Sequence, residues 1–74
     1  MKEKKIIVTG SSRGLGLHIA NKLLQEQHKV IFNGRSKKKK INYISGDFSN
    51  SVSSKKIIEK SYNTLKGLDV LICN

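Results

Sequence analysis

Short apolar runs alternate with helical patterns along the whole chain. The first run, Lys5–Thr9, is rich in β-branched residues and predicts a buried strand that stops at Gly10. From Gly14 onward, apolar residues recur about every 3.6 positions, which predicts a helix ending near Gln27. The apolar stripe of this helix consists of Leu15, Ile19, Ala20, Leu23 and Leu24. The next run, Lys29–Asn33, predicts a second strand that is stopped by Gly34.

The second half of the chain repeats this alternation. Ile41–Ser45 predicts a third strand, and Asn50 is a suitable N-cap for a helix that Gly67 ends. Leu68–Cys73 predicts a fourth strand, in which Cys73 is expected to be a small buried residue. One side of the second helix, expected to pack on the sheet, carries Val52, Ile57, Ile58, Tyr62 and Leu65.

Strands that alternate with helices predict an α/β fold with a parallel sheet covered on both faces. Parallel neighbours normally need a connection of about a dozen or more residues. Only Gly34–Lys40 separates the second predicted strand from the third, which is too short to hold a helix. We therefore expect that helix to be lost or reduced to a turn, so that one face of the sheet is less covered.

The stretch "TGSSRGLG" places three glycines between the first strand and the first helix. Gly10 permits a tight turn out of the strand, Gly14 lets the backbone approach a phosphate, and Gly16 lets the helix pack closely. The free N–H groups and the positive dipole end of a helix N-terminus then favour an anion. A kinase-type P-loop is excluded, because no Lys-Ser or Lys-Thr follows the last glycine.

With these glycines, the chain resembles the short-chain dehydrogenase/reductase superfamily, whose signature is Thr-Gly-x-x-x-Gly-x-Gly. Three further stretches match in order, namely "KVIFNGRS", "GDFSN" and "LDVLICN". The resemblance implies a Rossmann-like doubly wound parallel sheet, incomplete here, with about four strands and two helices. It also implies that Asp47 meets the adenine amino group and that the Phe48 backbone meets the ring. Cys73 and Asn74 fall at the two Asn positions of the family's Asn-Asn-Ala-Gly element.

The end of the second strand bears on the choice of cofactor. NAD-dependent enzymes of this fold place an acidic residue there, whereas this chain reads Asn-Gly-Arg-Ser. Arg35 could lie over a 2′-phosphate, and Arg13 lies where NADP-preferring members often carry a basic residue. We therefore expect NADP(H) rather than NAD(H). The expected cofactor-binding residues are Gly10, Ser12, Arg13, Gly14, Leu15, Gly16, Arg35, Asp47, Phe48 and Asn74.

Candidate catalytic and metal-binding residues do not form a convincing set. The family's catalytic Ser, Tyr and Lys lie beyond the fourth strand. Tyr62 and Lys66 imitate the Tyr-x-x-x-Lys pattern, with Ser49 upstream, but they precede the fourth strand. We expect no catalytic residue and no metal site, because His18 and His28 are isolated. Asp69 is expected only to end a turn.

The charge of the chain favours an anionic partner. Fifteen Lys and Arg against five Asp and Glu give a formal net charge of +10. The run Lys37–Lys40 could bind nucleic acid, but it has no interleaved aromatics, and a solvated loop that helps the cofactor phosphate is the preferred interpretation. No segment approaches the roughly 18 apolar residues of a membrane span, and we expect a cytoplasmic protein.

Residues 1–74 are thus predicted to be a partial dinucleotide-binding domain without the catalytic C-terminal half. The leading hypothesis is the NADP(H)-binding portion of an oxidoreductase that transfers hydride between a nicotinamide cofactor and a carbonyl or alcohol substrate. The chain alone is expected to be inactive, and the full-length form to be a homo-oligomer. The alternative is a non-enzymatic basic fragment that binds nucleotides or nucleic acid. Isolated folding is expected to be poor, because the first and fourth strands would expose apolar faces and unpaired edges.

Overall fold

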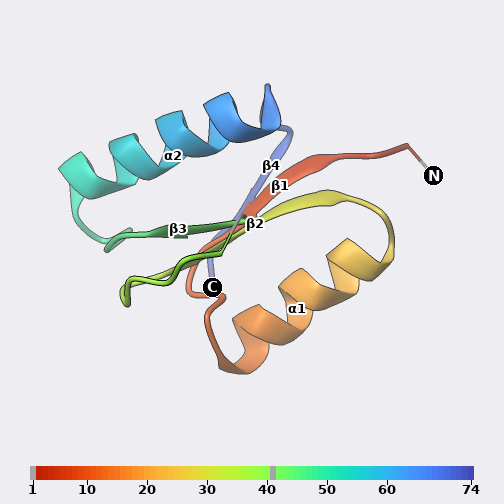
Figure 1. Ribbon diagram of the computed structural model, residues 1–74, viewed down its shortest axis with the longest axis horizontal. Coiled ribbons are helices and arrows are strands. Elements are labelled where there is room, and N and C mark those ends of the chain that lie inside the picture. The colour runs from red at the N-terminus through yellow and green to blue at the C-terminus, as the bar shows by residue number, and fades with distance from the viewer. Residues whose placement is uncertain (1, 41) are drawn as a thin grey trace.

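The computed structural model describes residues 2–40 and 42–74. Its elements, in chain order, are β1 (Lys5–Val8), α1 (Gly14–Gln25), β2 (Lys29–Gly34), β3 (Tyr43–Ser45), α2 (Ser51–Leu65) and β4 (Val70–Ile72). The four strands form one sheet in the order β3-β2-β1-β4, and every neighbouring pair is parallel. The helices α1 and α2 lie on opposite faces of this sheet (Figure 1). The predicted Rossmann-like α/β fold is confirmed.

Strand β1 lies in the middle of the sheet, between β2 and β4. Its residues Ile6, Ile7 and Val8 are at most 3% exposed, so the expectation that the first strand would present an open edge is wrong. The edges are β3 and β4, each three residues long. A first strand that pairs on both sides is central because α1 and α2 return the chain to opposite sides of it.

Side chains of β1 and β2 alternate between two small cores, as the two-residue period of a strand requires. Ile6, Val8 and Val30 pack with Ala20 beneath α1. On the other face, Ile7 and Ile31 pack with Leu65 of α2. Both faces of the central strands are therefore apolar, which explains why their sequences read as continuous runs rather than as alternating ones.

The buried face of α2 differs from the predicted stripe. Ile57, Ser61 and Leu65 face the sheet, whereas Val52 is 63% and Tyr62 57% exposed. The expectation that Val52 and Tyr62 pack on the sheet is therefore wrong. Ser61 fits there because it is small and its hydroxyl donates to the Ile57 carbonyl at 2.8 Å, so no polar group is left unpaired.

The helix α1 shows a similar difference at the two ends of its stripe. Gly16 and Ala20 are buried in its packed face, while Leu15 and Leu24 are 66% and 42% exposed. Small residues lie where α1 approaches most closely, and the larger side chains of Ile19 and Leu23 pack beside them against the same core. The apolar pattern located the helix correctly, and Ile19, Ala20 and Leu23 of its predicted stripe pack on the core.

The ends of three elements can also be compared with the sequence predictions. Cys73 follows β4 and is exposed, so the prediction of a buried strand residue is wrong. Asn50 caps α2 as predicted, because its Oδ1 accepts from the N–H groups of Val52 and Ser53. The third strand begins at Tyr43 rather than at Ile41, which lies outside the described residues.

The connection from β2 to β3 contains no helix within its described residues, 35–40 and 42, as the sequence predicted. Tyr43 is buried and holds this loop through its hydroxyl, which donates to the Ser36 carbonyl at 2.6 Å. Burial also raises the pKa of Tyr43, so the phenol remains a neutral donor. Neither helix in the described part of the chain is long and apolar enough to cross a membrane.

Candidate dinucleotide-binding site

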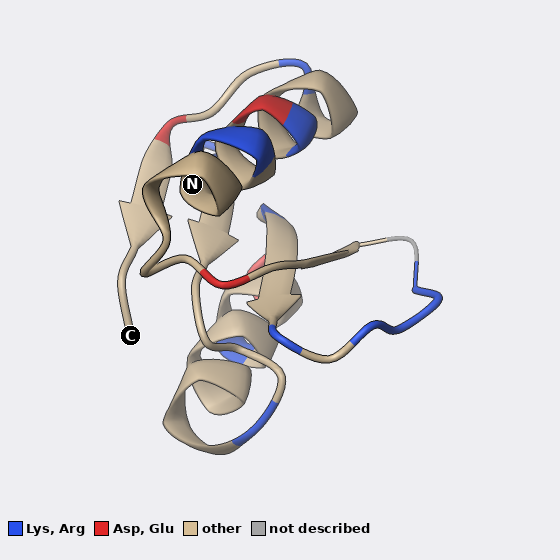
Figure 2. Cartoon of the chain, turned by 90° about the vertical axis from the view of Figure 1, so that its left-hand side faces the viewer, with Lys and Arg blue, Asp and Glu red and all other residues tan. Residues whose placement is uncertain are grey.

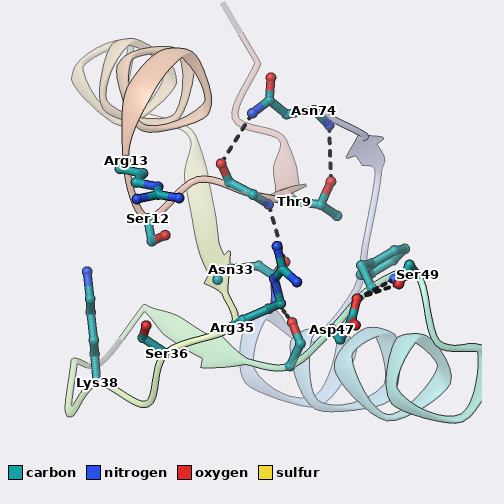
Figure 3. A pocket seen from close by; sticks show the side chains of 14 residues that line it. Thr9, Ser12, Arg13, Asn33, Arg35, Ser36, Lys38, Asp47, Ser49 and Asn74 are labelled. Atoms are coloured by element: carbon teal, nitrogen blue, oxygen red, sulfur yellow. Dashed lines mark hydrogen bonds between the residues drawn. The ribbon is translucent and has the colours of Figure 1, made fainter.

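A cleft of about 680 Å³ lies at the carboxyl ends of the strands, where the segments that follow β1, β2, β3 and β4 meet (Figure 3). Parallel α/β sheets bind ligands at this end. Seven of the ten predicted cofactor-binding residues line the cleft, namely Gly10, Ser12, Arg13, Arg35, Asp47, Phe48 and Asn74. The other three are Gly14, Leu15 and Gly16, which form the first turn of α1.

The N-terminus of α1 is open toward a ligand. Its N-cap residue, Arg13, makes no capping hydrogen bond through its side chain, and its first turn carries no acidic residue. At Gly14, with φ of 65°, an added Cβ would meet no atom within 4 Å. The N-terminus of α2 differs, because the side chain of Asn50 accepts hydrogen bonds from N–H groups of its first turn. The N–H groups of α1 therefore remain available to an anion.

Gly16 holds α1 against the turn that precedes it. A Cβ on Gly16 would lie 2.3 Å from the Gly10 carbonyl oxygen and 2.6 Å from Nδ2 of Asn74. Asn74 in turn donates from Nδ2 to the Gly10 carbonyl at 3.2 Å and from its backbone N–H to Thr9 Oγ1 at 3.1 Å. Asn74 thus connects the end of β4 to the glycine turn. This structural role is additional to the cofactor-binding role expected from the sequence.

Asn33 joins three strand ends at the base of the cleft, and the sequence analysis missed this role. Its Oδ1 accepts from the Gly10 N–H at 3.3 Å, and its Nδ2 donates to the carbonyls of Ile44 and Gly46 at 3.0 and 3.3 Å. Only 2% of the residue is exposed. Its backbone N–H donates to the buried Ser11 hydroxyl. A polar residue at the carboxyl end of an otherwise apolar strand was the available signal.

Three cations border the cleft. Arg13 comes from the glycine turn, while Arg35 and Lys38 come from the loop after β2. All three are exposed, and Figure 2 shows the basic residues of this loop as a band at the edge of the molecule. Asp47 is the one acidic residue among the described residues that line the cleft. The surroundings are therefore suited to an anionic group.

The carboxylate of Asp47 is held ionised by its neighbours. The Ser49 hydroxyl donates to it at 2.6 Å and the Ser49 N–H at 3.0 Å. These hydrogen bonds, with a smaller contribution from the charge of Arg35, lower the pKa of Asp47 below its ordinary value. The carboxylate is thus oriented by its own turn and offers acceptor oxygens at the cleft.

Replacing Ser49 with alanine is expected to raise the pKa of Asp47 toward its ordinary value, because the strongest donor is removed. In the native chain the folded-state pKa is the lower one. The stabilisation is therefore present above the ordinary carboxyl pKa and is lost as the pH falls through the folded value. A carbon-13 NMR titration of the Asp47 carboxyl measures this change. Ser51→Ala is the control, and an unchanged titration in Ser49→Ala would contradict the assignment.

Of the residues that imitate a catalytic pattern, Ser49 lies far from Tyr62 and Lys66. Ser49 precedes α2, whereas Lys66 follows its last turn. At about 1.5 Å per residue, the helix separates them by roughly 20 Å. Tyr62 lies on the exposed side of α2. The side chain of Ser49 therefore does not share one site with those of Tyr62 and Lys66.

The other singled-out residues have structural contacts. His28 is buried, and its Nδ1 accepts from the Lys4 N–H at 3.0 Å. Asp69 accepts from the Lys5 N–H at 2.9 Å, which joins β4 to the start of β1 at the opposite end of the sheet. No group of three His, Cys, Asp or Glu side chains suited to a metal occurs among residues 2–40 and 42–74.

A parallel sheet in this order, with a glycine turn leading into an uncapped helix, defines a Rossmann-like α/β protein. The chain belongs to the short chain dehydrogenase family, whose model matches residues 4–74. A solved apo SCOR enzyme from Clostridium thermocellum superposes with a TM-score of 0.83 at 29% identity, over 95% of this chain and 32% of that one.

Two curated relatives are similar at the sequence level. A glucose 1-dehydrogenase of Gluconobacter oxydans is 34% identical over 96% of this chain and 32% of its own length. The uncharacterized oxidoreductase YvrD of Bacillus subtilis is also 34% identical, over 100% of this chain and 32% of its own length. The chain thus spans about a third of the relatives it matches.

The match with YvrD extends over 86 positions although this chain has 74 residues, so at least 12 positions of that relative have no counterpart here.

Proposed function

We propose that this chain is the NADP(H)-binding part of a short-chain oxidoreductase. The observation that carries the proposal is the position of Arg13 and Arg35 on one cleft beside the open N-terminus of α1. Asn33 and Gly34 end β2, so no carboxylate stands where one would bind the ribose hydroxyls of NAD. Cations without that carboxylate favour a 2′-phosphate over a free hydroxyl.

Each part of the cleft has a role in this proposal. The N–H groups of Gly14, Leu15 and Gly16 bind the pyrophosphate, assisted by the dipole of α1. Asp47 and the Phe48 backbone bind the adenine edge, while Arg13 and Arg35 bind the 2′-phosphate. Asn74, at the end of β4, keeps the glycine turn in place. When bound, the nicotinamide cofactor supplies the hydride chemistry.

The reaction is proposed for a protein that contains this segment, because the chain covers about a third of its relatives. That reaction is reversible hydride transfer between the cofactor and a small carbonyl or alcohol substrate. Residues 1–74 would form a partial dinucleotide-binding domain, and catalytic groups would come from elsewhere in such a protein. We further propose that the protein acts in the cytoplasm as a homo-oligomer, as its resemblance to the family implies.

Cofactor titration tests this proposal directly. The protein is expected to bind NADPH at least about tenfold more tightly than NADH, because 2′-phosphate contacts with arginine are charge-assisted. Arg35→Met should reduce that preference by about tenfold and leave NADH binding within about twofold. Isothermal titration calorimetry measures both affinities. The exposed Lys56 on α2 provides a charge-matched control as Lys56→Met.

A short duplex DNA at two salt concentrations completes the experiment. Weak, non-selective binding that vanishes at the higher salt concentration is expected for any chain this basic. Strong DNA binding together with equal affinity for NADPH and NADH would overturn the proposal. It would support the basic nucleic-acid-binding alternative instead.

A further inference from the structure

The four consecutive lysines of the β2–β3 loop do not share one environment. Lys38 lines the dinucleotide cleft, together with Arg13, Arg35 and Ser36. Lys37 and Lys40 lie outside it, each bordering a different hollow, and Lys38 borders both of these hollows in addition to the cleft. Lys39 also borders only those outer hollows. A run of identical residues thus directs one side chain to the site, which the sequence alone could not distinguish.

The Lys38 side chain lies over the ring of Tyr43. The Lys38 ammonium lies 5.7 Å from the centre of the Tyr43 ring, within the range of a cation–π contact. Tyr43 is only 8% exposed, and its hydroxyl donates to the Ser36 carbonyl at 2.6 Å. The ring is therefore fixed relative to the loop, and it restricts where the ammonium can go.

The glycine turn approaches the same loop from the other side. A Cβ on Gly34 would lie 2.6 Å from both the Ser12 hydroxyl and the Tyr43 hydroxyl, so these two groups meet across Gly34. Figure 3 shows the Lys38 side chain extending from the loop toward the turn that carries Ser12 and Arg13. Lys38 and the two arginines therefore border one volume.

The short connection is the reason for this arrangement. A doubly wound sheet ordinarily places a crossover helix between such strands. Here the described residues of the connection, 35–40 and 42, form bends and a turn rather than a helix, and Lys38 lies among them. Without a helix to carry this segment onto a face of the sheet, Lys38 stays at the cleft.

We propose that Lys38 is a third cation of the 2′-phosphate subsite, and that the shortened β2–β3 connection brings it there. The inference rests on the proposed function and adds a specificity-determining residue to it. Lys38 contributes a compact ammonium charge beside the planar guanidinium groups of Arg13 and Arg35. Its charge discriminates between a phosphate and a hydroxyl at the 2′ position and leaves the pyrophosphate contacts unchanged.

The test compares four variants of the expressed protein by calorimetry. Lys38→Met keeps the length of the side chain and removes its charge. It is expected to reduce the ratio of NADPH to NADH affinity by about tenfold, as the loss of one charge-assisted contact implies. Lys37→Met and Lys40→Met remove the same charge from neighbouring positions and should change the ratio by less than about twofold. Lys38→Arg should retain the preference.

Two nucleotides that correspond to the adenosine half of the cofactor, one with and one without a 2′-phosphate, show whether Lys38 acts on that phosphate. Adenosine 2′,5′-bisphosphate should lose affinity for Lys38→Met by the same factor as NADPH, and adenosine 5′-monophosphate should lose none. If all three methionine variants weaken NADPH equally, the contribution is a diffuse field of the loop and the inference about Lys38 is overturned. If only Lys38→Met behaves like the unsubstituted protein, the inference is likewise wrong, while the NADPH preference still supports the proposed function. If the unsubstituted protein prefers neither dinucleotide, the proposed function itself fails.

Discussion

Replacing Asn33 with aspartate is expected to lower the free energy of unfolding by about 3 kcal/mol at neutral pH, because it leaves a buried carboxylate without adequate partners. The amide donates to the carbonyls of Ile44 and Gly46, and a carboxylate in its place would face those oxygens instead. Only the hydrogen bond from the Gly10 N–H would remain. No other position in the cleft connects three strand ends through one side chain in the described part of the chain.

The pH dependence of this variant provides a second signature. An unpaired buried carboxylate has a raised pKa in the folded state. Stability of Asn33→Asp should therefore be regained at low pH and lost as the pH rises through that raised value. Urea denaturation followed by circular dichroism, at neutral pH and near pH 4, measures the difference. A variant that is unfolded at neutral pH but folds on acidification meets the expectation.

The matched control is Asn42→Asp, which introduces the same charge at an exposed position on the neighbouring loop. It should alter the free energy of unfolding by no more than about 0.5 kcal/mol. Equal stabilities of the two variants would show that Asn33 does not hold the strand ends together. The cleft would then depend on backbone pairing alone.

Replacing Gly16 with alanine is expected to cost about 1–3 kcal/mol of unfolding free energy, as overpacking does elsewhere. Helix propensity acts in the opposite direction, since alanine is favoured over glycine in a helix by about 1 kcal/mol. The contact decides the sign, because the added Cβ would lie 2.3 Å from the Gly10 carbonyl oxygen, a backbone atom with little freedom to move. The helix must shift away from the turn.

This shift should also weaken dinucleotide binding, because it displaces the N–H groups at the start of α1 from the cleft. Thermal or urea denaturation and an NADPH titration measure the two effects separately. Leu15→Ala is the control for stability, since Leu15 is 66% exposed and adjacent in the same turn. A more stable Gly16→Ala protein with unchanged NADPH affinity would contradict the close packing described above.

The N-termini of the two helices differ in whether a side chain caps them. At α2, Asn50 satisfies the first N–H groups, and the helix start needs nothing further. At α1, the backbone turns through Gly10 and Gly14 with positive φ, and no side chain of the described residues caps the helix. An open helix start at the carboxyl end of a parallel sheet offers its free N–H groups and positive dipole end to an anion.

The sequence by itself determined the order of the elements and the end of the sheet at which the site lies. Alternating apolar runs and helical stripes located all six elements to within about two residues of their observed ends. The glycine spacing predicted the turn, and the length of Gly34–Lys40 predicted that no helix follows β2. These inferences succeed because local backbone geometry and chain length constrain them directly.

Only the tertiary structure decided which side chains of each element make contact. Tyr62 and Ser61 are neighbours in sequence, yet Ser61 faces the sheet because α2 packs along Ile57, Ser61 and Leu65. Likewise, Asn33 gains its role only when Gly10 and Ile44 are brought beside it by strands from distant parts of the chain. The same holds for Lys38, which differs from its neighbouring lysines solely in the direction that Tyr43 and the loop impose. A pattern along the chain specifies periodicity, whereas the orientation of one element against another depends on contacts between residues far apart in sequence.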